Sequence, residues 1–144
     1  MRIKRTRIVI VFLLFIYFSL LSCATEEETV RPQQLSEGIN LEFVGNRIDL
    51  RNPLPRNGEE VEVIVTVRNL GNQQARRIPV SFYDNHMVFF TAEIDLEPGK
   101  QYGVIAGWRA TTGNHVLSVI IDPTRQFKGT VRENNKVERA VLVR

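Results

Sequence analysis

Cysteine is almost missing from this 144-residue sequence, which contains only Cys23. Beyond that position no thiol can form a disulfide, act as a nucleophile or bind a metal as thiolate. Small exported domains often rely on disulfides to supplement a limited core. A domain formed by the rest of this chain must therefore be held together by the burial of apolar side chains alone.

Histidine and the common catalytic motifs are also scarce. His86 and His115 are the only histidines, and their spacing matches no metal-binding pair. No serine lies in a Gly-x-Ser-x-Gly motif, and no glycine-rich loop is suited to phosphate. Glu59, Glu60 and Glu62 are close in sequence, but Glu60 and Glu62 are expected on the solvent face of a strand. We expect no cofactor and no enzyme activity; carboxylates brought together from distant segments are the catalytic arrangement that stays open.

A strong excess of charge of one sign is absent from the part of the chain that is expected to fold. The whole sequence has a net charge of +3. Four basic residues precede Cys23, namely Arg2, Lys4, Arg5 and Arg7. Without them, 15 Lys and Arg remain against 16 Asp and Glu, a net charge of about −1. This composition gives no support to nucleic acid as a partner.

The N-terminus has the pattern of a bacterial lipoprotein signal. The four basic residues precede an apolar run from Ile8 to Leu21, 14 residues long. A membrane-spanning helix needs about 20 apolar residues, so this run has the length of a secretory signal instead. It ends in Ser19-Leu20-Leu21-Ser22-Cys23, which resembles the lipobox of bacterial lipoproteins. We predict a signal peptide at 1–22, cleavage between Ser22 and Cys23, and acyl chains on Cys23 that anchor the protein firmly.

A polar stretch follows the predicted lipidation site. Residues 24–38 include a short acidic run and have the composition of a flexible tether. The expected organisation is a signal peptide at 1–22, a lipidated cysteine and tether at 23–38, and one domain at 39–144. The expected location is the bacterial cell envelope. Ala24 stands where Asp would favour inner-membrane retention, which indicates the outer membrane if the species is Gram-negative.

From residue 39 onward, the hydrophobic pattern repeats every two residues. Val61, Val63, Val65 and Val67 lie at alternate positions, as in a half-buried strand. Turn sequences rich in Gly, Asn, Asp and Pro separate the later runs, which are 78–83, 88–96, 102–108, 117–121 and 137–143. With an opening strand within 39–50, about seven short strands follow at the spacing typical of a sandwich. We therefore predict an all-β fold, an immunoglobulin-like antiparallel β-sandwich.

Three positions carry specific expectations about the strands that contain them. Pro79 has no N–H, which predicts an open or bulged side on its strand, and an open edge could accept a strand from another chain. Arg139 interrupts the apolar face of the last strand. Trp108 shares one strand face with Tyr102 and is expected to pack in the core between the sheets.

Apolar residues on outward strand faces would mark a contact surface. Phe89 and Phe90 are adjacent, so one ring is expected in the core and the other exposed. Ile64 and Ile120 lie opposite the inward faces of their strands. These four residues form a possible interface; scattered surface apolar residues of no functional meaning are the alternative.

The order of these features resembles the CARDB domain, a bacterial immunoglobulin-like module described as cell-adhesion related. The resemblance covers about 39–143 and nearly the whole predicted domain. It rests on Val61–Gly71 with its Asn69-Leu70-Gly71 ending, Val80–Asp84, Leu96–Gly99, Trp108, Gly113–His115, Ile121-Asp122 and Glu133–Asn135. It implies a β-sandwich and an extracytoplasmic location more than a defined activity.

One oxygen-rich group of residues lies around the loop before the last strand. Asp122, Glu133, Asn134 and Asn135 are a weak candidate for calcium, which takes six to eight oxygen ligands. The CARDB family usually has a longer acidic, Asn-rich stretch here, whereas this chain has two basic residues in it. The alternative, which we favour, is that the Asn side chains cap backbone groups where the loop enters the last strand, with no metal bound.

The sequence therefore favours a non-enzymatic envelope lipoprotein that uses its sandwich for protein–protein contact or adhesion. Its expected partners are the membrane, through the lipid on Cys23, and another envelope protein. The second hypothesis is a module that binds carbohydrate or peptidoglycan, with Tyr83, Phe89, Phe90 or Trp108 stacking on sugars. The third is an enzyme with spatially assembled carboxylates.

Overall fold

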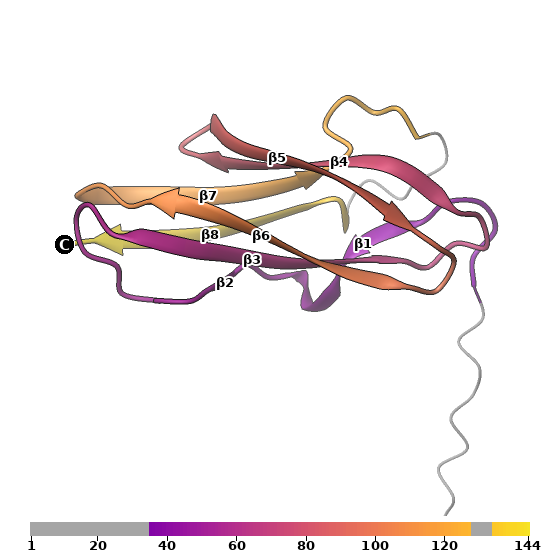
Figure 1. Cartoon of the computed structure of the whole chain (residues 1–144), viewed down its shortest axis with the longest axis horizontal. Coiled ribbons are helices and arrows are strands. Elements are labelled where there is room, and N and C mark those ends of the chain that lie inside the picture. Colours follow the sequence, from indigo (N-terminus) through magenta and orange to yellow (C-terminus); the bar gives the residue numbers. More distant parts are fainter. Residues whose placement is uncertain (1–34, 128–133) are drawn as a thin grey trace, which may run out of the picture. The chain divides into compact units, whose positions relative to one another are not determined.

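Eight strands form two antiparallel sheets in the computed structural model, which describes residues 35–127 and 134–144 (Figure 1). In chain order the elements are β1 (Leu41–Phe43), the 3-10 helix η1 (Val44–Asn46), β2 (Asp49–Leu50), β3 (Glu60–Asn69), β4 (Ala75–Asp84), β5 (Met87–Leu96), β6 (Gln101–Arg109), β7 (Gly113–Ile121) and β8 (Lys136–Val143). The predicted all-β sandwich is thus confirmed. The predicted signal peptide, the Ser22–Cys23 site and nearly all of the tether lie outside the described residues. Within the described ranges, no helix is long and apolar enough to cross a membrane.

The opening segment contains two strands where one was expected. Gly45 and Asn46 have positive φ angles of 71° and 48°, so η1 turns the chain between β1 and β2. β1 pairs with β3 near Val67–Asn69, and β2 pairs with it near Val63–Ile64. The two short strands therefore follow one another along a single edge of β3.

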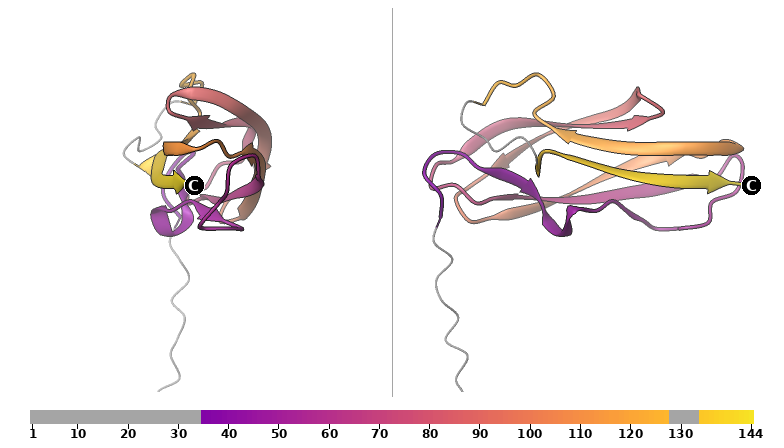
Figure 2. Two further views of the ribbon diagram at one scale, coloured as in Figure 1. Left: turned by 90° about the vertical axis from the view of Figure 1, so that its left-hand side faces the viewer. Right: turned by 180° about the vertical axis from the view of Figure 1, so that it is seen from behind.

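The two long sides of the sandwich are built from different strands. In the first sheet, β3 has β1 and β2 on one side and β6 on the other; the second sheet has the order β5-β4-β7-β8. The free edges of β5 and β6 lie together on one long side (Figure 1). β8 and the β1–β2 segment lie together on the other side, seen from behind in Figure 2.

The core lies between the two sheets and follows the predicted alternation. Val61, Val63, Val65 and Val67 are buried on β3, and the residues between them are half-buried or exposed. The facing sheet contributes buried residues at alternate positions of β4, β7 and β8: Ile78, Val80, Phe82, Leu117, Val119, Ile121, Val137, Val141 and Val143. Each fully buried side chain of this size stabilises the fold by about 1.5–3 kcal/mol. Apolar burial is therefore the main force that holds the domain together.

Pro79 and Arg139 were both expected to disturb the regular pattern of their strands, and the structure accommodates them differently. Residues 76–77 form the predicted bulge next to Pro79, where Arg77 has φ 50° and its N–H donates to the Asp95 carboxylate at 2.7 Å. The open edge expected there was wrong, because β4 is an interior strand between β5 and β7. The missing N–H of Pro79 falls where the β4–β7 ladder ends, so it costs little pairing. Arg139 donates from Nη1 to the Ile48 carbonyl at 2.9 Å and so ties β8 to the segment before β2.

The Asn69-Leu70-Gly71 ending of β3 holds three segments together. The Asn69 side chain is fully buried; Oδ1 accepts from the Gly71 N–H at 2.9 Å, and Nδ2 donates to the Gln73 carbonyl at 2.8 Å and the Leu96 carbonyl at 3.3 Å. At Gly71 an added Cβ would lie 2.0 Å from the Gly38 carbonyl oxygen. Only glycine permits this approach, so the motif serves packing of the N-terminal segment.

Candidate functional site

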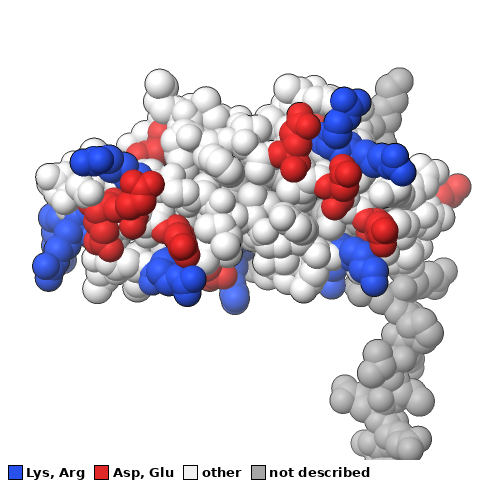
Figure 3. All heavy atoms as spheres, in the orientation of Figure 1, with Lys and Arg blue, Asp and Glu red and all other residues white. Residues whose placement is uncertain are grey.

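The long side formed by β5 and β6 has few charged residues, and we call residues 87–96 and 101–109 the β5–β6 seam. β5 has no charged residue from Met87 to Ala92, and β6 has none from Gln101 to Trp108. In the view of Figure 3, Lys, Arg, Asp and Glu gather toward the two ends of the molecule and leave the middle uncharged. Edge strands of natural proteins usually carry charges or proline that discourage pairing with other chains. The seam lacks this protection over most of its length.

Exposed apolar side chains concentrate on the same seam. Among the described residues nine large apolar side chains are exposed, and five of them belong to β5 or β6: Met87, Val88, Phe90, Tyr102 and Ile105. Tyr102 was expected on the buried face with Trp108, but it is 54% exposed because it lies at the open side of an edge strand. Such clustering of apolar surface is typical of a contact site.

The four residues singled out as a possible interface do not lie on one surface. Ile64 is on the outer face of the first sheet, paired with Ile105, whereas Ile120 is on the outer face of the second sheet. Phe89 packs against the core and Phe90 is 37% exposed, as expected for neighbours on a strand. Both rings still lie edge-on to Phe82, at 6.1 and 5.7 Å between centroids, because the β4–β5 register shifts at this point. Phe89 and Phe90 belong to the seam, Ile64 adjoins it through Ile105, and Ile120 is separate from it.

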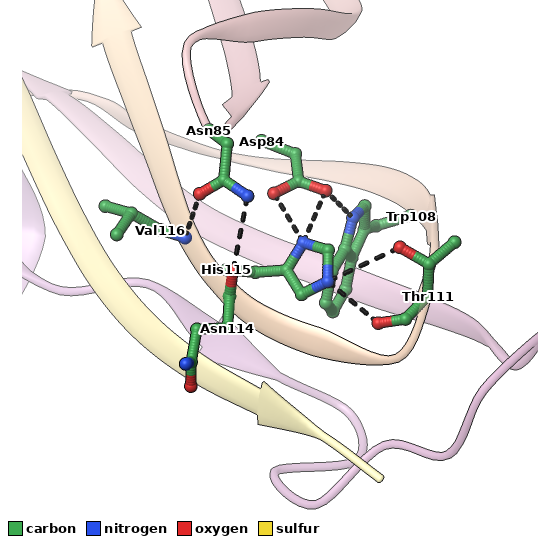
Figure 4. A network of polar contacts seen from close by, with 7 residues as sticks. All are labelled: Asp84, Asn85, Trp108, Thr111, Asn114, His115 and Val116. Atoms are coloured by element: carbon green, nitrogen blue, oxygen red, sulfur yellow. Dashed lines mark hydrogen bonds and ion pairs between the residues drawn. The ribbon is translucent and has the colours of Figure 1, made fainter.

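A buried polar network closes one end of the seam (Figure 4). Asp84 at the end of β4 accepts from Trp108 Nε1 on β6 at 3.0 Å, and its two carboxylate oxygens lie 2.7 and 2.8 Å from His115 Nδ1. His115 Nε2 lies 2.8 Å from the Thr111 carbonyl oxygen. Trp108 is 2% exposed, which confirms the expected core position. The network therefore links the two sheets through side chains.

The ring nitrogens of His115 in this network contact other groups of the same chain. His115 Nδ1 contacts the Asp84 carboxylate, and Nε2 contacts the carbonyl oxygen and, at 3.4 Å, the hydroxyl of Thr111, so both ring nitrogens have partners within the chain. The sequence analysis did not predict the network, since Asp84 and His115 lie 31 positions apart and were named within separate segments of the family resemblance. Nothing local in the sequence signals a contact made between two strands of a sheet.

The calcium candidate is only partly described by the structure. Asp122 is buried, and its two carboxylate oxygens accept from the N–H groups of Gln126 at 2.8 Å and Phe127 at 3.0 Å. Asn134 is exposed, Asn135 is buried, and Glu133 lies outside the described residues. No group of three or more His, Cys, Asp or Glu that could hold a metal occurs in 35–127 or 134–144. Asp122 therefore caps its own loop. The capping expected of the Asn side chains is not seen at Asn135, because its buried Oδ1 has no hydrogen-bond partner among the described residues.

A cavity of about 400 Å³ lies beside that loop, on the second sheet. Its walls include the Tyr83 ring, the Ile120 side chain and the cationic side chains of Arg125 and Lys136. It is therefore a polar, partly aromatic hollow, distinct in character from the uncharged seam.

Comparison with known proteins gives a consistent family assignment. The sequence model of the CARDB family matches residues 44–139. A crystal structure described as a CARDB domain from Pyrococcus furiosus in complex with di-metal ions has 20% identity and a TM-score of 0.68, covering 76% of this chain and 92% of that one. A solution structure of that CARDB domain has 20% identity and a TM-score of 0.67, covering 74% of this chain and 96% of the other. A domain described as part of a cell-surface protein from Methanosarcina acetivorans has 18% identity and a TM-score of 0.58, covering 76% and 94%.

Enzymes also contain a domain of this shape. A β-glucosidase from Listeria innocua has 15% identity and a TM-score of 0.51, but the match covers 73% of this chain and only 16% of the enzyme. At these identities, likeness shows the fold alone. The comparison with curated protein sequences gave no match.

Proposed function

This chain belongs to the CARDB family, and we propose that it is a lipid-anchored protein of the bacterial cell envelope whose sandwich makes contacts with other proteins. The observation that carries the proposal is the β5–β6 seam, a pair of free sheet edges on which five of the nine exposed large apolar side chains of the described residues gather. A surface of this kind is suited to another polypeptide, because a protein partner supplies both apolar area and backbone hydrogen bonds.

Anchoring through Cys23 is the first part of the proposal. The basic, apolar and Ser22–Cys23 segments fall in the order required for export and lipidation. In growing cells supplied with labelled fatty acid, the wild-type chain should take up label and sediment with membranes, and Cys23→Ala should do neither. A matched Thr25→Ala variant should behave as wild type. Equal labelling of Cys23→Ala would refute the lipid anchor.

Placement in the outer membrane is a second, separable part. Ala24 is the residue on which it rests, and only a Gram-negative host makes the test meaningful. Wild type is expected in the outer-membrane fraction, and Ala24→Asp in the inner-membrane fraction. Recovery of wild type with the inner membrane would contradict the placement while leaving the anchor intact.

We also propose that the domain is not catalytic and needs no metal. The support comes from the polar groups that the structure describes: His115 and Asp84 are committed to each other and to Trp108, and Asp122 caps its own loop. The di-metal complex of the Pyrococcus furiosus domain is a property of that protein, and the described residues here contain no group of three or more His, Cys, Asp or Glu that could hold a metal.

The protein-contact role is tested by crosslinking in cells followed by capture of the full chain. Ile105→Asp should remove the crosslinked protein species, because it places a charge at the centre of the seam. Leu142→Asp is the matched control, since Leu142 is similarly exposed, at 50%, on the outer face of β8. A crosslinking pattern that is the same for both variants would show that the seam is not the contact site.

Binding of carbohydrate or peptidoglycan is the competing proposal, and the cavity beside Tyr83 favours it. Trp108 is no longer a candidate for stacking on a sugar, because it is buried. Purified cell-wall material should retain wild type but not Tyr83→Ala if this proposal holds, with Tyr102→Ala as the control on the other side of the molecule. If the cell-wall material does not retain the wild type, the carbohydrate-binding proposal is refuted.

A further inference from the structure

β6 has a complete free edge of backbone hydrogen-bonding groups. At the two ends of the β3–β6 ladder, Asn69 N–H donates to the Lys100 carbonyl at 2.9 Å, and Ala110 N–H donates to the Glu59 carbonyl at 2.8 Å. The register between these ends is unbroken over nine residue pairs. Backbone groups of successive residues alternate between the two edges of a strand. The even-numbered residues of β6 therefore bond to β3, and the odd-numbered residues direct their N–H and C=O groups outward.

The edges of β5 and β8 carry devices that discourage pairing, and β6 does not. β5 is shifted in register at Phe89 and has Glu93 and Asp95 in its second half. β8 carries Lys136 and Glu138, which pair at 2.7 Å on an exposed surface. β6 is regular and uncharged from Gln101 to Trp108, and it contains no proline. Among these strands β6 is the one best suited to receive another strand.

Two glycines of β6 are not needed by this chain's own backbone. Gly103 and Gly107 do not have positive φ angles, and a Cβ at Gly103 would meet nothing within 4 Å. A Cβ at Gly107 would approach only the flexible end of the Glu60 side chain, at 2.7 Å from Oε1. Glycine inside a strand costs about 0.5–1 kcal/mol relative to alanine. Such a position often marks the close approach of another backbone.

The sequence of β6 is nearly the same when read in either direction from Ile105. The matched positions are Val104 with Ala106, Gly103 with Gly107, Tyr102 with Trp108, and Gln101 with Arg109. A strand of this kind is complementary to itself in antiparallel pairing, since small residues oppose small ones and aromatic residues oppose aromatic ones. Arg109 would oppose an uncharged Gln101, so no like charges meet.

We propose that β6 pairs antiparallel with β6 of a second copy of this chain, about a two-fold axis at Ile105. In this register, Ile105 opposes Ile105 of the second copy and Gly103 opposes Gly107 of the second copy. All of these are odd-numbered residues, so the outward backbone groups of both strands meet as hydrogen-bonded pairs. The four-stranded sheet that contains β6 in one copy joins the same sheet of the second copy into one continuous sheet, and both copies use the same patch.

The same arrangement explains the apolar side chains next to the edge. Met87, Val88 and Phe90 on β5 and Tyr102 on β6 lie on the side of the sandwich that the second copy approaches. This inference names the partner of the proposed protein contact and so rests on the proposed function. It is independent of the lipid anchor.

Cysteine crosslinking of the full chain in cells tests the register directly. Opposed residues of a hydrogen-bonded pair have Cα atoms about 5.5 Å apart, within the range that a disulfide spans. Ile105→Cys should therefore form a disulfide-linked dimer under mild oxidation. Gly103→Cys and Gly107→Cys should link to each other when co-expressed but not when expressed alone, because each lies about 13 Å from its own symmetry copy. Leu142→Cys is the exposed control, and the parent chain shows any background from Cys23.

A proline variant tests the role of the outward backbone. Gly103→Pro removes an outward N–H without removing a bond to β3, and Gly103→Ala adds a Cβ in open space but keeps the N–H. For the purified full chain in detergent, Gly103→Pro should weaken dimerisation at least tenfold, with Gly103→Ala close to wild type. Both should melt within a few degrees of wild type, which confirms that they fold.

The outcomes separate this inference from the proposed function. If Ile105→Cys does not link to a second copy but is crosslinked to a different protein, the dimer is overturned and the seam remains a protein contact site. Absence of every crosslink at Ile105→Cys would overturn both. A dimer that Gly103→Pro leaves unchanged would place the interface elsewhere and overturn the β6 pairing.

Discussion

The two long sides of this sandwich enclose one core but treat their sheet edges differently. On the side of β8 and the β1–β2 segment, the Arg139 side chain bonds to the Ile48 carbonyl, and Ser36 and Gly38 bond to the chain between Leu70 and Gln73. On the side of β5 and β6, the edges carry apolar side chains and no comparable cover among the described residues. Backbone groups at a sheet edge are therefore satisfied either from within the chain or by water and a partner. Substitutions on the first side should change stability, and those on the outer surface of the second should change association.

The largest effect is expected at the covered end of β3. Asn69→Ala leaves the Gly71 N–H and the Gln73 and Leu96 carbonyls without their side-chain partner in a buried position. Stability should fall by about 3 kcal/mol, measured by urea unfolding of the full chain in detergent. Asn114→Ala, at an exposed position, is the control. A loss below about 1 kcal/mol would mean that the Asn69 contacts are not what holds this end.

Substitution on the buried face of β6 should lower stability almost as much, whereas substitution of an exposed residue of the same strand should not. Trp108→Phe removes the donor to Asp84 and leaves a void between the sheets, so stability should fall by about 2 kcal/mol. Thermal unfolding measures this loss, and Tyr102→Phe, on the same strand but exposed, should have almost no effect. Equal melting temperatures for wild type and Trp108→Phe would contradict the structural role assigned to the network.

A smaller effect is expected where β8 meets the β1–β2 segment. Arg139→Met keeps the apolar stem of the side chain but removes the hydrogen bond to Ile48, at a cost of about 1 kcal/mol. Arg109→Met, on the open side, should change stability by less than about 0.5 kcal/mol. Similar values for the two variants in chemical denaturation would erase the distinction between the two sides.

On the open side itself, stability should barely respond. Ile105 is 54% exposed, so Ile105→Thr should alter the free energy of unfolding by less than about 0.5 kcal/mol. Its effect should appear instead as a weaker concentration dependence of sedimentation. A loss of stability with unchanged sedimentation is the opposite result, and it would make Ile105 a packing residue.

The smallest expected effect is electrostatic and lies in the turn before β3. Asn52 Nδ2 donates to Glu59 at 2.8 Å and the Arg56 N–H donates to it at 3.0 Å; these bonds lower the pKa of Glu59 below its ordinary value of 4.5. The stabilisation is therefore complete above pH 4.5 and is lost as the pH falls through the lowered pKa. In denaturation at several pH values, Glu59→Gln should differ from wild type above pH 4.5 and approach it in acid. A difference that grows in acid would reverse the sign assigned here.

Several features of the fold follow from short-range patterns and were predicted. The period of two in Val61–Val67 assigns one face of β3 to the core, and the turn residues at Asn85 and at Pro98-Gly99 end the strands where expected. Trp108 falls inside for the same reason. The register shift at Phe82–Tyr83 and the split of the opening strand have no comparable signal, because each depends on what the neighbouring strand does.

The alternation of apolar residues and the all-β class follow from the sequence alone, because each depends on residues that are close together along the chain. Export and lipidation are predicted from equally local patterns. The tertiary structure alone decided that β4 is interior, that β6 is an edge, and that Asp84, His115 and Trp108 meet. These depend on which strands become neighbours, and that choice is made by the packing of two whole sheets over one core. The near-symmetry of β6 about Ile105 was present in the sequence throughout, but it acquires a physical meaning only once its free edge is known.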